Sequence, residues 1–328
     1  MRNFADRVIK AIYDNMSYLC VGLDPQLRYF PPHILQFCAR KYGPGYRATA
    51  EAIIMFNKTI IDATNEFAFA FKPQMAFYEK YGHEGVRAFE ETVAYALLTG
   101  KIVIEDAKRE DGDDTARAYA DGHLGQVDVI GKGGELMLVP NAYGVDAVTI
   151  TPWIEEPNFK PFFEVAIKEG RGLFVVDRTS FKPTSSLQEM KDENGDTGWM
   201  KLARKIKEMG EEAKGDNGYS SFGVVMGATY PEDATKMKEI LPMAFKLIPG
   251  FGAGQGGKPD EAVVCVNEDG FGIIPNNSRG TNYAWHPRFK SEFQCDPRSY
   301  ALAAAKASEQ ARDALNDAVR RRVGKLPW

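Results

Sequence analysis

The segment Lys101-Ile102-Val103-Ile104-Glu105-Asp106-Ala107-Lys108-Arg109-Glu110-Asp111 joins a short apolar run directly to a dense group of charges. If the apolar run is a strand, its side chains alternate between two faces, so Asp106 and Lys108 point the same way. Asp111 then follows in the next loop. Charges at the mouth of a buried strand are costly to desolvate unless they pair, and sites that stabilise developing charge tolerate that cost. The pattern therefore indicates either a catalytic site or a solvated strand end with salt bridges.

Similar apolar runs recur along the chain, and most of them end in polar, glycine or proline residues. Including the first, they are Tyr18–Leu23, Phe67–Phe71, Lys101–Ile104, Ala147–Ile150, Leu173–Val176, Phe222–Met226, Ala244–Ile248 and Phe271–Ile274. They are continuous rather than alternating, which is typical of strands covered on both faces. Helical patterns lie between them, at Ala48–Ala63, Val86–Leu98, Phe162–Lys168 and Pro231–Leu241.

This alternation of strands and helices predicts a parallel (β/α)8 barrel, the TIM barrel. An open doubly wound sheet is disfavoured because no G-x-G-x-x-G sequence follows the first run. We expect one domain over residues 1–328, with excursions from the barrel at about 121–144 and 185–219. The first excursion is glycine-rich, and the second contains a helical pattern, Trp199–Lys214. The alanine-rich stretch Pro297–Val323 predicts a last helix on the outside of the barrel.

Composition narrows the class of protein. A net charge of −4 argues against a nucleic-acid-binding protein. The four cysteines have no C-x-x-C spacing and the four histidines have no metal-site spacing, so we expect no zinc site, no disulfide scaffold and a cytoplasmic location. The amino-terminal residues lack the pattern of a signal peptide. The sequence contains no run of about 18 apolar residues, so we expect no membrane-spanning helix.

Polar residues follow most of the predicted strands, at the end of the barrel where TIM-barrel chemistry takes place. They are Asp24, Lys72, Asp106, Lys108, Arg178, Thr179, Ser180, Asn276, Asn277, Ser278 and Arg279. We expect Lys72 and Lys108 to share this mouth with Asp24, Asp106 and Asp111. Because the opposite charges alternate, all five groups can stay ionised, and their titrations would be coupled.

The sequence after the seventh predicted strand, Pro249-Gly250-Phe251-Gly252-Ala253-Gly254-Gln255-Gly256-Gly257, indicates a phosphate site. Glycines let backbone N–H groups approach an anion, and the last two loops are the usual phosphate position in such barrels. Arg279 would supply a bidentate charge and Gln255 a neutral donor. The alternative is a flexible glycine-rich turn. No metal cage is obvious, although Asp106 with Glu105 or Asp111 is a conceivable Mg²⁺ pair.

An ordered set of motifs resembles the orotidine 5'-phosphate decarboxylase family, in particular its longer bacterial members. The motifs are Val21-Gly22-Leu23-Asp24-Pro25, Phe71-Lys72-Pro73, Asp106-Ala107-Lys108-Arg109 with Asp111 and Thr115, Arg178-Thr179-Ser180, Gly227-Ala228-Thr229-Tyr230-Pro231, the Gly250–Gly257 loop and Ser278-Arg279-Gly280. The D-x-K-x-x-D pattern alone is shared with sugar-phosphate enzymes of the same suprafamily. The ordered set, which spans most of the chain, is much more specific.

The resemblance implies removal of CO₂ from orotidine 5'-monophosphate to give UMP, a step of de novo pyrimidine biosynthesis, without cofactor or metal. It implies that Lys108 protonates C6 and that Asp106 flanks the substrate carboxylate. It further implies a homodimer in which Asp111 and Thr115 reach into the partner's site. The remaining implied contacts are Asp24 and Lys72 to the ribose, Ser180 to the pyrimidine, and Gln255 and Arg279 to the phosphate.

Two departures from the family pattern stand out. Glu110-Asp111-Gly112 occupies the place of the usual Gly-Asp-Ile, so an isoleucine that lines an apolar wall is missing. The phosphate loop also carries an extra residue within Ala253-Gly254-Gln255. Two other functions therefore stay open: a Mg²⁺-dependent sugar-phosphate aldolase or synthase of the same suprafamily, and a non-catalytic phosphoribosyl-binding barrel.

Overall fold

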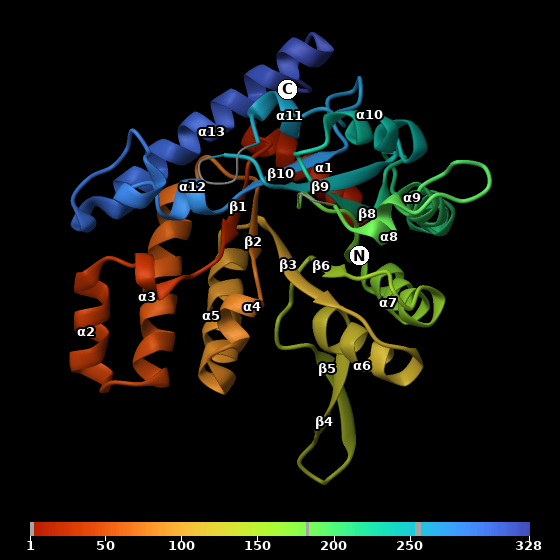
Figure 1. The fold of residues 1–328 in the computed structure, drawn as a ribbon. Coiled ribbons are helices and arrows are strands. Elements are labelled where there is room, and N and C mark those ends of the chain that lie inside the picture. Colours follow the sequence, from red (N-terminus) through yellow and green to blue (C-terminus); the bar gives the residue numbers. More distant parts are fainter. Residues whose placement is uncertain (1–2, 182–183, 253–256) are drawn as a thin grey trace.

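The protein, described by a computed structural model over residues 3–181, 184–252 and 257–328, folds around a closed barrel of eight parallel strands (Figure 1). Around the barrel the strands follow the order β1, β2, β3, β6, β7, β8, β9 and β10, and β10 pairs with β1. Their bounds are β1 Cys20–Leu23, β2 Ala70–Pro73, β3 Ile102–Arg109, β6 Ala147–Ile150, β7 Gly172–Arg178, β8 Ser220–Met226, β9 Ala244–Pro249 and β10 Ile273–Asn277. The predicted TIM barrel and its eight strands are confirmed.

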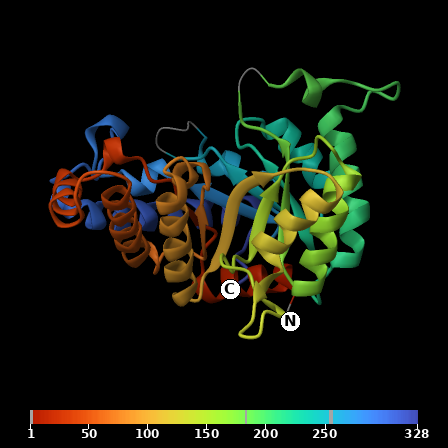
Figure 2. The same cartoon turned by 90° about the horizontal axis from the view of Figure 1, so that it is seen from below.

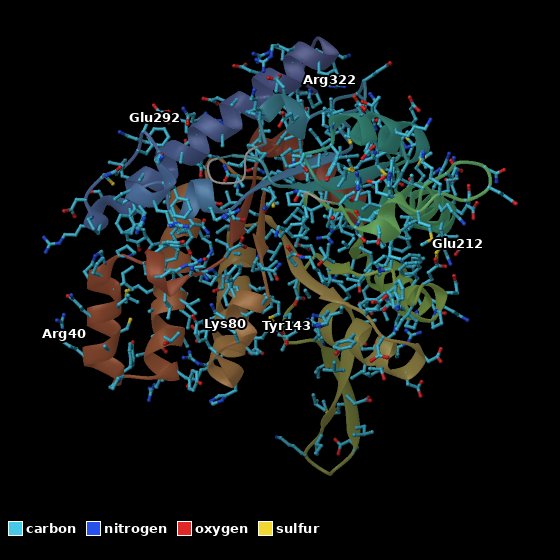
Figure 3. All side chains as sticks on the ribbon, viewed as in Figure 1. Arg40, Lys80, Tyr143, Glu212, Glu292 and Arg322 are labelled. Atoms are coloured by element: carbon cyan, nitrogen blue, oxygen red, sulfur yellow. The ribbon has the colours of Figure 1, made fainter. Side chains whose placement is uncertain are left out.

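The short strands are buried on both faces, which explains their continuous apolar runs. Every residue of β1, β2, β6, β8 and β10 is buried. Buried side chains from the strands and the surrounding helices form one hydrophobic core, whereas charged side chains such as Arg40, Lys80 and Glu292 lie on the outside (Figure 3). No helix in the described part of the chain is long and apolar enough to cross a membrane.

Helices cover the outside of the barrel (Figures 1 and 2). The α-helices are α1 Phe4–Asn15, α2 Pro32–Tyr42, α3 Tyr46–Thr64, α4 Ala76–Glu79, α5 Gly82–Leu98, α6 Asp113–Leu124, α7 Glu156–Glu169, α8 Ser186–Glu189, α9 Gly198–Met209, α10 Pro231–Ile240, α11 Pro259–Ala262, α12 Arg279–Asn282 and α13 Tyr300–Val323. Short 3-10 turns are η1 Leu27–Tyr29, η2 Gly210–Ala213, η3 Pro287–Phe289 and η4 Pro297–Ser299. All the predicted helices are present. The predicted Trp199–Lys214 and Pro297–Val323 helices each include one of these 3-10 turns, η2 and η4.

Helix α1 was not predicted, and it covers the amino-terminal ends of three strands. The ring of Phe4 packs edge-on against Phe174 of β7, and Arg7 forms an ion pair with Asp146 just before β6. The carboxylate of Asp6 accepts hydrogen bonds from the backbone that leads into β8. This end of the barrel is therefore closed by packing, which leaves the opposite end for a site.

The two predicted excursions contain regular structure and return to the same barrel. The first holds an antiparallel hairpin, β4 Gln126–Ile130 and β5 Leu136–Pro140, which extends beyond the barrel in both views (Figures 1 and 2). The second holds α8 and α9, and α9 packs against β7 and β8. The sequence pattern indicated only a glycine-rich segment for the first, so the hairpin was missed.

Candidate active site

A cavity of about 460 Å³ opens at the carboxyl ends of the strands and brings together five of the predicted site residues: Lys72, Asp106, Lys108, Ser180 and Arg279. Its other lining residues are Val176, Thr179, Phe181, Val225, Thr229, Leu247, Pro249 and Gly250. The two lysines and the aspartate come from β2 and β3, and Arg279 begins α12 directly after β10. The cavity thus combines a charged wall with a predominantly apolar one.

Asp106 is the centre of the charged wall. Its Oδ2 lies 2.8 Å from Nζ of Lys72, and its Oδ1 accepts a hydrogen bond from Nζ of Lys108. The hydroxyl of Thr149, on β6, donates to the same Oδ1 at 3.0 Å. Burial raises the pKa of Asp106, but the two ammonium groups outweigh it and hold that pKa below its ordinary value. Asp106 is therefore a carboxylate whose orientation is fixed from two sides.

Lys72 is only 3% exposed, and two carboxylates offset the effect of its burial. Burial lowers the pKa of Lys72, whereas the carboxylates of Asp106 and Asp24 raise it, and the net direction is upward. Burial also raises the pKa of Asp24, which follows β1, and Lys72 opposes that shift. Asp24 is not among the residues that line the cavity, so the expectation that it shares this mouth is not met, and its Oδ1 has no hydrogen-bond partner among the residues described.

Lys108 reaches Asp106 through an irregular backbone rather than through strict strand alternation. Its φ is +54°, in the left-handed region, and the β3–β6 register shifts between Glu105 and Arg109. The amide of Lys108 donates to Oγ1 of Thr149 at 3.0 Å. Such a conformation costs on the order of 1–3 kcal/mol in a non-glycine residue and is concentrated at functional sites. The predicted meeting of Asp106 and Lys108 within one strand occurs, although the backbone of that strand is irregular at Lys108.

Glycines shape the wall opposite the lysines. A Cβ on Gly227 would lie 2.5 Å from the backbone of Ser180, so only glycine allows this close approach. The hydroxyl of Thr229 donates to the carbonyl of Ser180 at 2.9 Å. Gly250 and Gly252 have φ values of +99° and +93°, in the region that favours glycine, and the amide of Gly252 donates to the carbonyl of Gly257 at 3.0 Å. Gln255 lies outside the described residues.

Asp111 and Thr115 do not line the cavity of their own chain. The amide of Asp111 donates to Oδ1 of Asn158 at 3.3 Å, and Thr115 lies in the first turn of α6. The expectation that Asp111 shares a mouth with the other charges is therefore not met within one subunit. Their predicted place in a partner's site stays a prediction.

The possible Mg²⁺ pair of Asp106 with Glu105 is wrong. The carboxylate of Glu105 points to the other face of β3, where its Oε2 lies 2.7 Å from Nδ1 of His123. Among the described residues, no group of three or more histidine, cysteine or acidic side chains is arranged to hold a metal ion.

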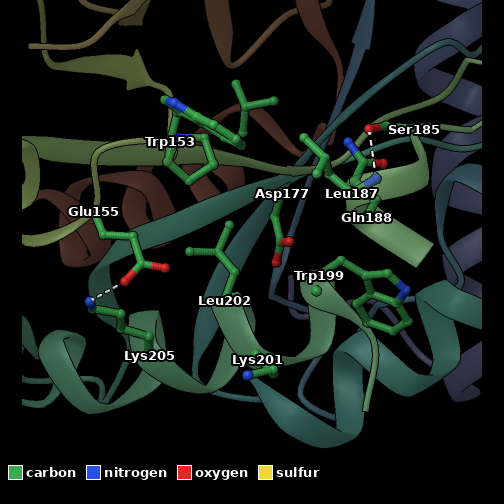
Figure 4. A pocket seen from close by; sticks show the side chains of 13 residues that line it. Trp153, Glu155, Asp177, Ser185, Leu187, Gln188, Trp199, Lys201, Leu202 and Lys205 are labelled. Carbon is green, nitrogen blue, oxygen red and sulfur yellow. Dashed lines mark hydrogen bonds and ion pairs between the residues drawn. The ribbon is translucent and has the colours of Figure 1, made fainter. Parts of the chain in front are cut away.

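Sequence reasoning missed two polar residues near the site, Thr149 and Asp177. Thr149 stands at the end of β6, where a search of every strand end would have found it. Asp177 borders a separate cavity of about 580 Å³, which shares Val176 with the first and is lined by Trp153, Trp199 and Leu202 (Figure 4).

The Asp177 side chain is 2% exposed, and neither of its carboxylate oxygens has a hydrogen-bond partner among the described residues. Burial raises its pKa well above the ordinary value, although Arg178 opposes that shift. Although its cavity is the larger of the two, none of the predicted site residues lines it.

Comparisons with known proteins identify the family of the chain. The model of the orotidine 5'-phosphate decarboxylase / HUMPS family matches residues 17–270. Orotidine 5'-phosphate decarboxylases from Rhodopirellula baltica and Caldicellulosiruptor saccharolyticus are 32% and 31% identical, over 96% and 97% of this chain and 99% and 100% of theirs. The solved structure of Leishmania donovani OMP decarboxylase is 25% identical with a TM-score of 0.67, over 95% of this chain and 99% of that one. The chain therefore belongs to the orotidine 5'-phosphate decarboxylase / HUMPS family.

Proposed function

We propose that this protein decarboxylates orotidine 5'-monophosphate to UMP, a step of pyrimidine biosynthesis. The observation that carries the proposal is the Lys72–Asp106–Lys108 arrangement in the wall of a cavity that also contains Arg279. The names of the relatives support the same reaction.

Substrate binding uses the two ends of the cavity. Arg279 binds the phosphate, because a guanidinium matches phosphate oxygens in two parallel hydrogen bonds. Gln255 adds a neutral donor to the phosphate, and Ser180 contacts the pyrimidine. Lys72 and Asp24 bind the ribose. Phosphate binding far from the reacting carbon supplies energy for positioning the pyrimidine.

The reaction breaks the bond between C6 and the carboxylate carbon, CO₂ leaves, and the electron pair stays on C6. A fixed ammonium group near C6 favours this developing carbanion more than it favours the substrate. Lys108 supplies that ammonium and then donates its proton to C6, so UMP forms and the lysine is reprotonated from solvent. Asp106 accepts a hydrogen bond from the Lys108 ammonium and so orients it. No step requires a cofactor.

The site is completed in a homodimer. Asp111 and Thr115 lie at and just beyond the loop after β3, outside the cavity of their own chain, and there they are available to a neighbouring subunit. In this arrangement each active site takes Asp106 and Lys108 from one chain and Asp111 from the other.

The test is the loss of orotidine 5'-monophosphate absorbance with purified protein in the presence of a chelator, with UMP identified as the product. Turnover that survives chelation supports the decarboxylase. If metal is required and only sugar phosphates react, the protein is instead a sugar-phosphate aldolase or synthase. Tight binding of UMP without any turnover would mean a phosphoribosyl-binding barrel.

A further inference from the structure

Glu110, where the family usually has glycine, is anchored by both of its carboxylate oxygens. Its Oε2 accepts a hydrogen bond from the hydroxyl of Thr151 at 2.8 Å, and its Oε1 accepts one from the amide of Ile154 at 2.7 Å. Both donors belong to the segment that follows β6. With both oxygens accepting from neutral donors, Glu110 joins the loop after β3 to the loop after β6.

Asn158 ties the same two loops together from the other side of Asp111. It is fully buried in the first turn of α7. Its Oδ1 accepts from the amide of Asp111 at 3.3 Å, and its Nδ2 donates to the carbonyl of Thr151 at 3.0 Å. Asp111 therefore follows Glu110 directly in the sequence, and its own amide is hydrogen-bonded to Asn158.

The segment that receives these bonds is held in an unusual conformation. Glu155, the residue after Ile154, has a φ of +57°, which a non-glycine residue adopts only when its surroundings impose it. The bond from the Ile154 amide to Glu110 is one such constraint, and the bonds that the carbonyl of Glu155 accepts from the first turn of α7 are others. The loop after β6 is thus a shaped support for the loop that carries Asp111.

We infer that Glu110 and Asn158 are positioning residues that act through Asp111, by fixing its backbone for the active site that it completes. This inference rests on the proposed function, because it gives Asp111 a role in turnover. A glycine at position 110 could not make either bond of the Glu110 carboxylate, and Gly112, on the other side of Asp111, has no side chain that could hold the loop. In this chain the position of Asp111 therefore depends on Glu110 and Asn158.

A double-mutant cycle tests the inference. Glu110→Ala and Asn158→Ala are each made in the wild-type and in the Asp111→Asn background, and kcat/KM for orotidine 5'-monophosphate is measured at enzyme concentrations that reveal residual turnover. A displacement of about 1 Å costs roughly 100-fold in rate. We expect a loss of about 10- to 100-fold in the wild-type background and less than about twofold when Asp111 is already altered. Equal losses in both backgrounds would overturn the inference, as would no loss in the wild type.

Three controls separate a positioning role from damage to the fold. Glu156→Ala removes an exposed carboxylate from the start of α7 and should leave kcat/KM unchanged. Thr151→Val removes a donor to Glu110 and should lower kcat/KM, whereas Thr151→Ser keeps the hydroxyl and should restore it. If Glu110→Ala does not fold, Thr151→Val and Thr151→Ser replace it in the double-mutant cycle. Normal turnover of Asp111→Asn alone would instead show that the proposed role of Asp111 is wrong.

Discussion

The ammonium of Lys72 lies 2.8 Å from Oδ2 of Asp106, and both groups are almost completely buried at the carboxyl ends of adjacent strands. Buried charges of this kind are expensive to desolvate, and their attraction offsets the cost only while both are present. Lys108, the second partner of Asp106, is 42% exposed in its side chain. The two lysines therefore differ in how much the fold depends on them.

Replacing Asp106 with asparagine should destabilise the protein and abolish turnover. The substitution leaves the Lys72 ammonium buried without its closest counter-charge, which typically costs about 3–5 kcal/mol in the free energy of unfolding. Urea unfolding measures this loss. A variant as stable as the wild type would mean that Lys72 finds another partner or loses its proton at little cost.

Lys108→Ala should abolish turnover without destabilising the fold. No other ammonium is both in the cavity wall and sufficiently exposed to reach a bound pyrimidine among the described residues. Initial rates with orotidine 5'-monophosphate and a melting curve check both halves of the prediction. Lys80→Ala, a change on the outer surface, is the control that should leave the rate unchanged. Near-normal activity of Lys108→Ala would refute the proposed proton donor.

The barrel could be predicted from the sequence because burial on two faces produces continuous apolar runs, and each of the eight predicted runs became a barrel strand. The hairpin β4–β5 was missed because its segment was interpreted only as glycine-rich, although β5, Leu136–Pro140, is itself a short apolar run. Both strands are largely exposed, so an apolar run here does not indicate burial. Helix α1 was missed because its polar first residues were considered only as a possible leader. An amphipathic search from Phe4 to Ile12 would have found it.

The site was only partly predictable. The identities of Lys72, Asp106 and Arg279 followed from their places at strand ends. The left-handed backbone of Lys108 could not be foreseen, because lysine has no preference for positive φ and the conformation is imposed by bonds such as that to Thr149. The anchoring of Glu110 depends on a loop more than 40 residues away, and such a pairing is set by tertiary structure alone.

Mixing two inactive variants should restore activity if the active sites are shared between subunits. Lys108→Ala lacks the proton donor, and Asp111→Ala lacks the residue that reaches into the partner's site. A mixed dimer has one site with both residues intact, so up to about half of the dimers recover one working site out of two when exchange is random. Decarboxylation is assayed after subunit exchange. No recovery, with exchange shown by mass spectrometry of labelled chains, would contradict the shared site.

Asp177→Asn should stabilise the protein near neutral pH. Burial raises the pKa of Asp177 in the folded state, so the unfolded chain ionises first as the pH rises. The wild type therefore loses stability from the ordinary aspartate pKa of about 3.9 upward, until the folded group ionises as well. We expect the variant to be more stable by about 1–3 kcal/mol at pH 7 and the difference to shrink toward pH 4. Melting curves across this range measure the difference.

The control for Asp177 is Asp233→Asn. Asp233 pairs with the buried guanidinium of Arg178 at 2.7 Å, so removing its charge should lower stability at pH 7. Opposite changes in stability at pH 7 for the two substitutions would distinguish a buried carboxyl without a partner from one that is paired with an arginine. If Asp177→Asn lowers stability at pH 7, Asp177 has a stabilising partner and its ionised form is favoured.

Arg279→Ala should weaken binding of UMP far more than binding of uridine, which has no phosphate. Arg279 follows β10 and lines the cavity beside Gly250, where the glycine-rich loop begins. A charged hydrogen bond contributes roughly 1.5–3 kcal/mol net, which is about 10- to 100-fold in affinity. Because binding of the remote phosphate also supports the chemistry, the variant should lose turnover as well as affinity. Isothermal titration with both ligands separates the two effects, and Arg40→Ala on the outer surface is the control. If the affinities for UMP and uridine fall equally, Arg279 is structural and another group binds the phosphate.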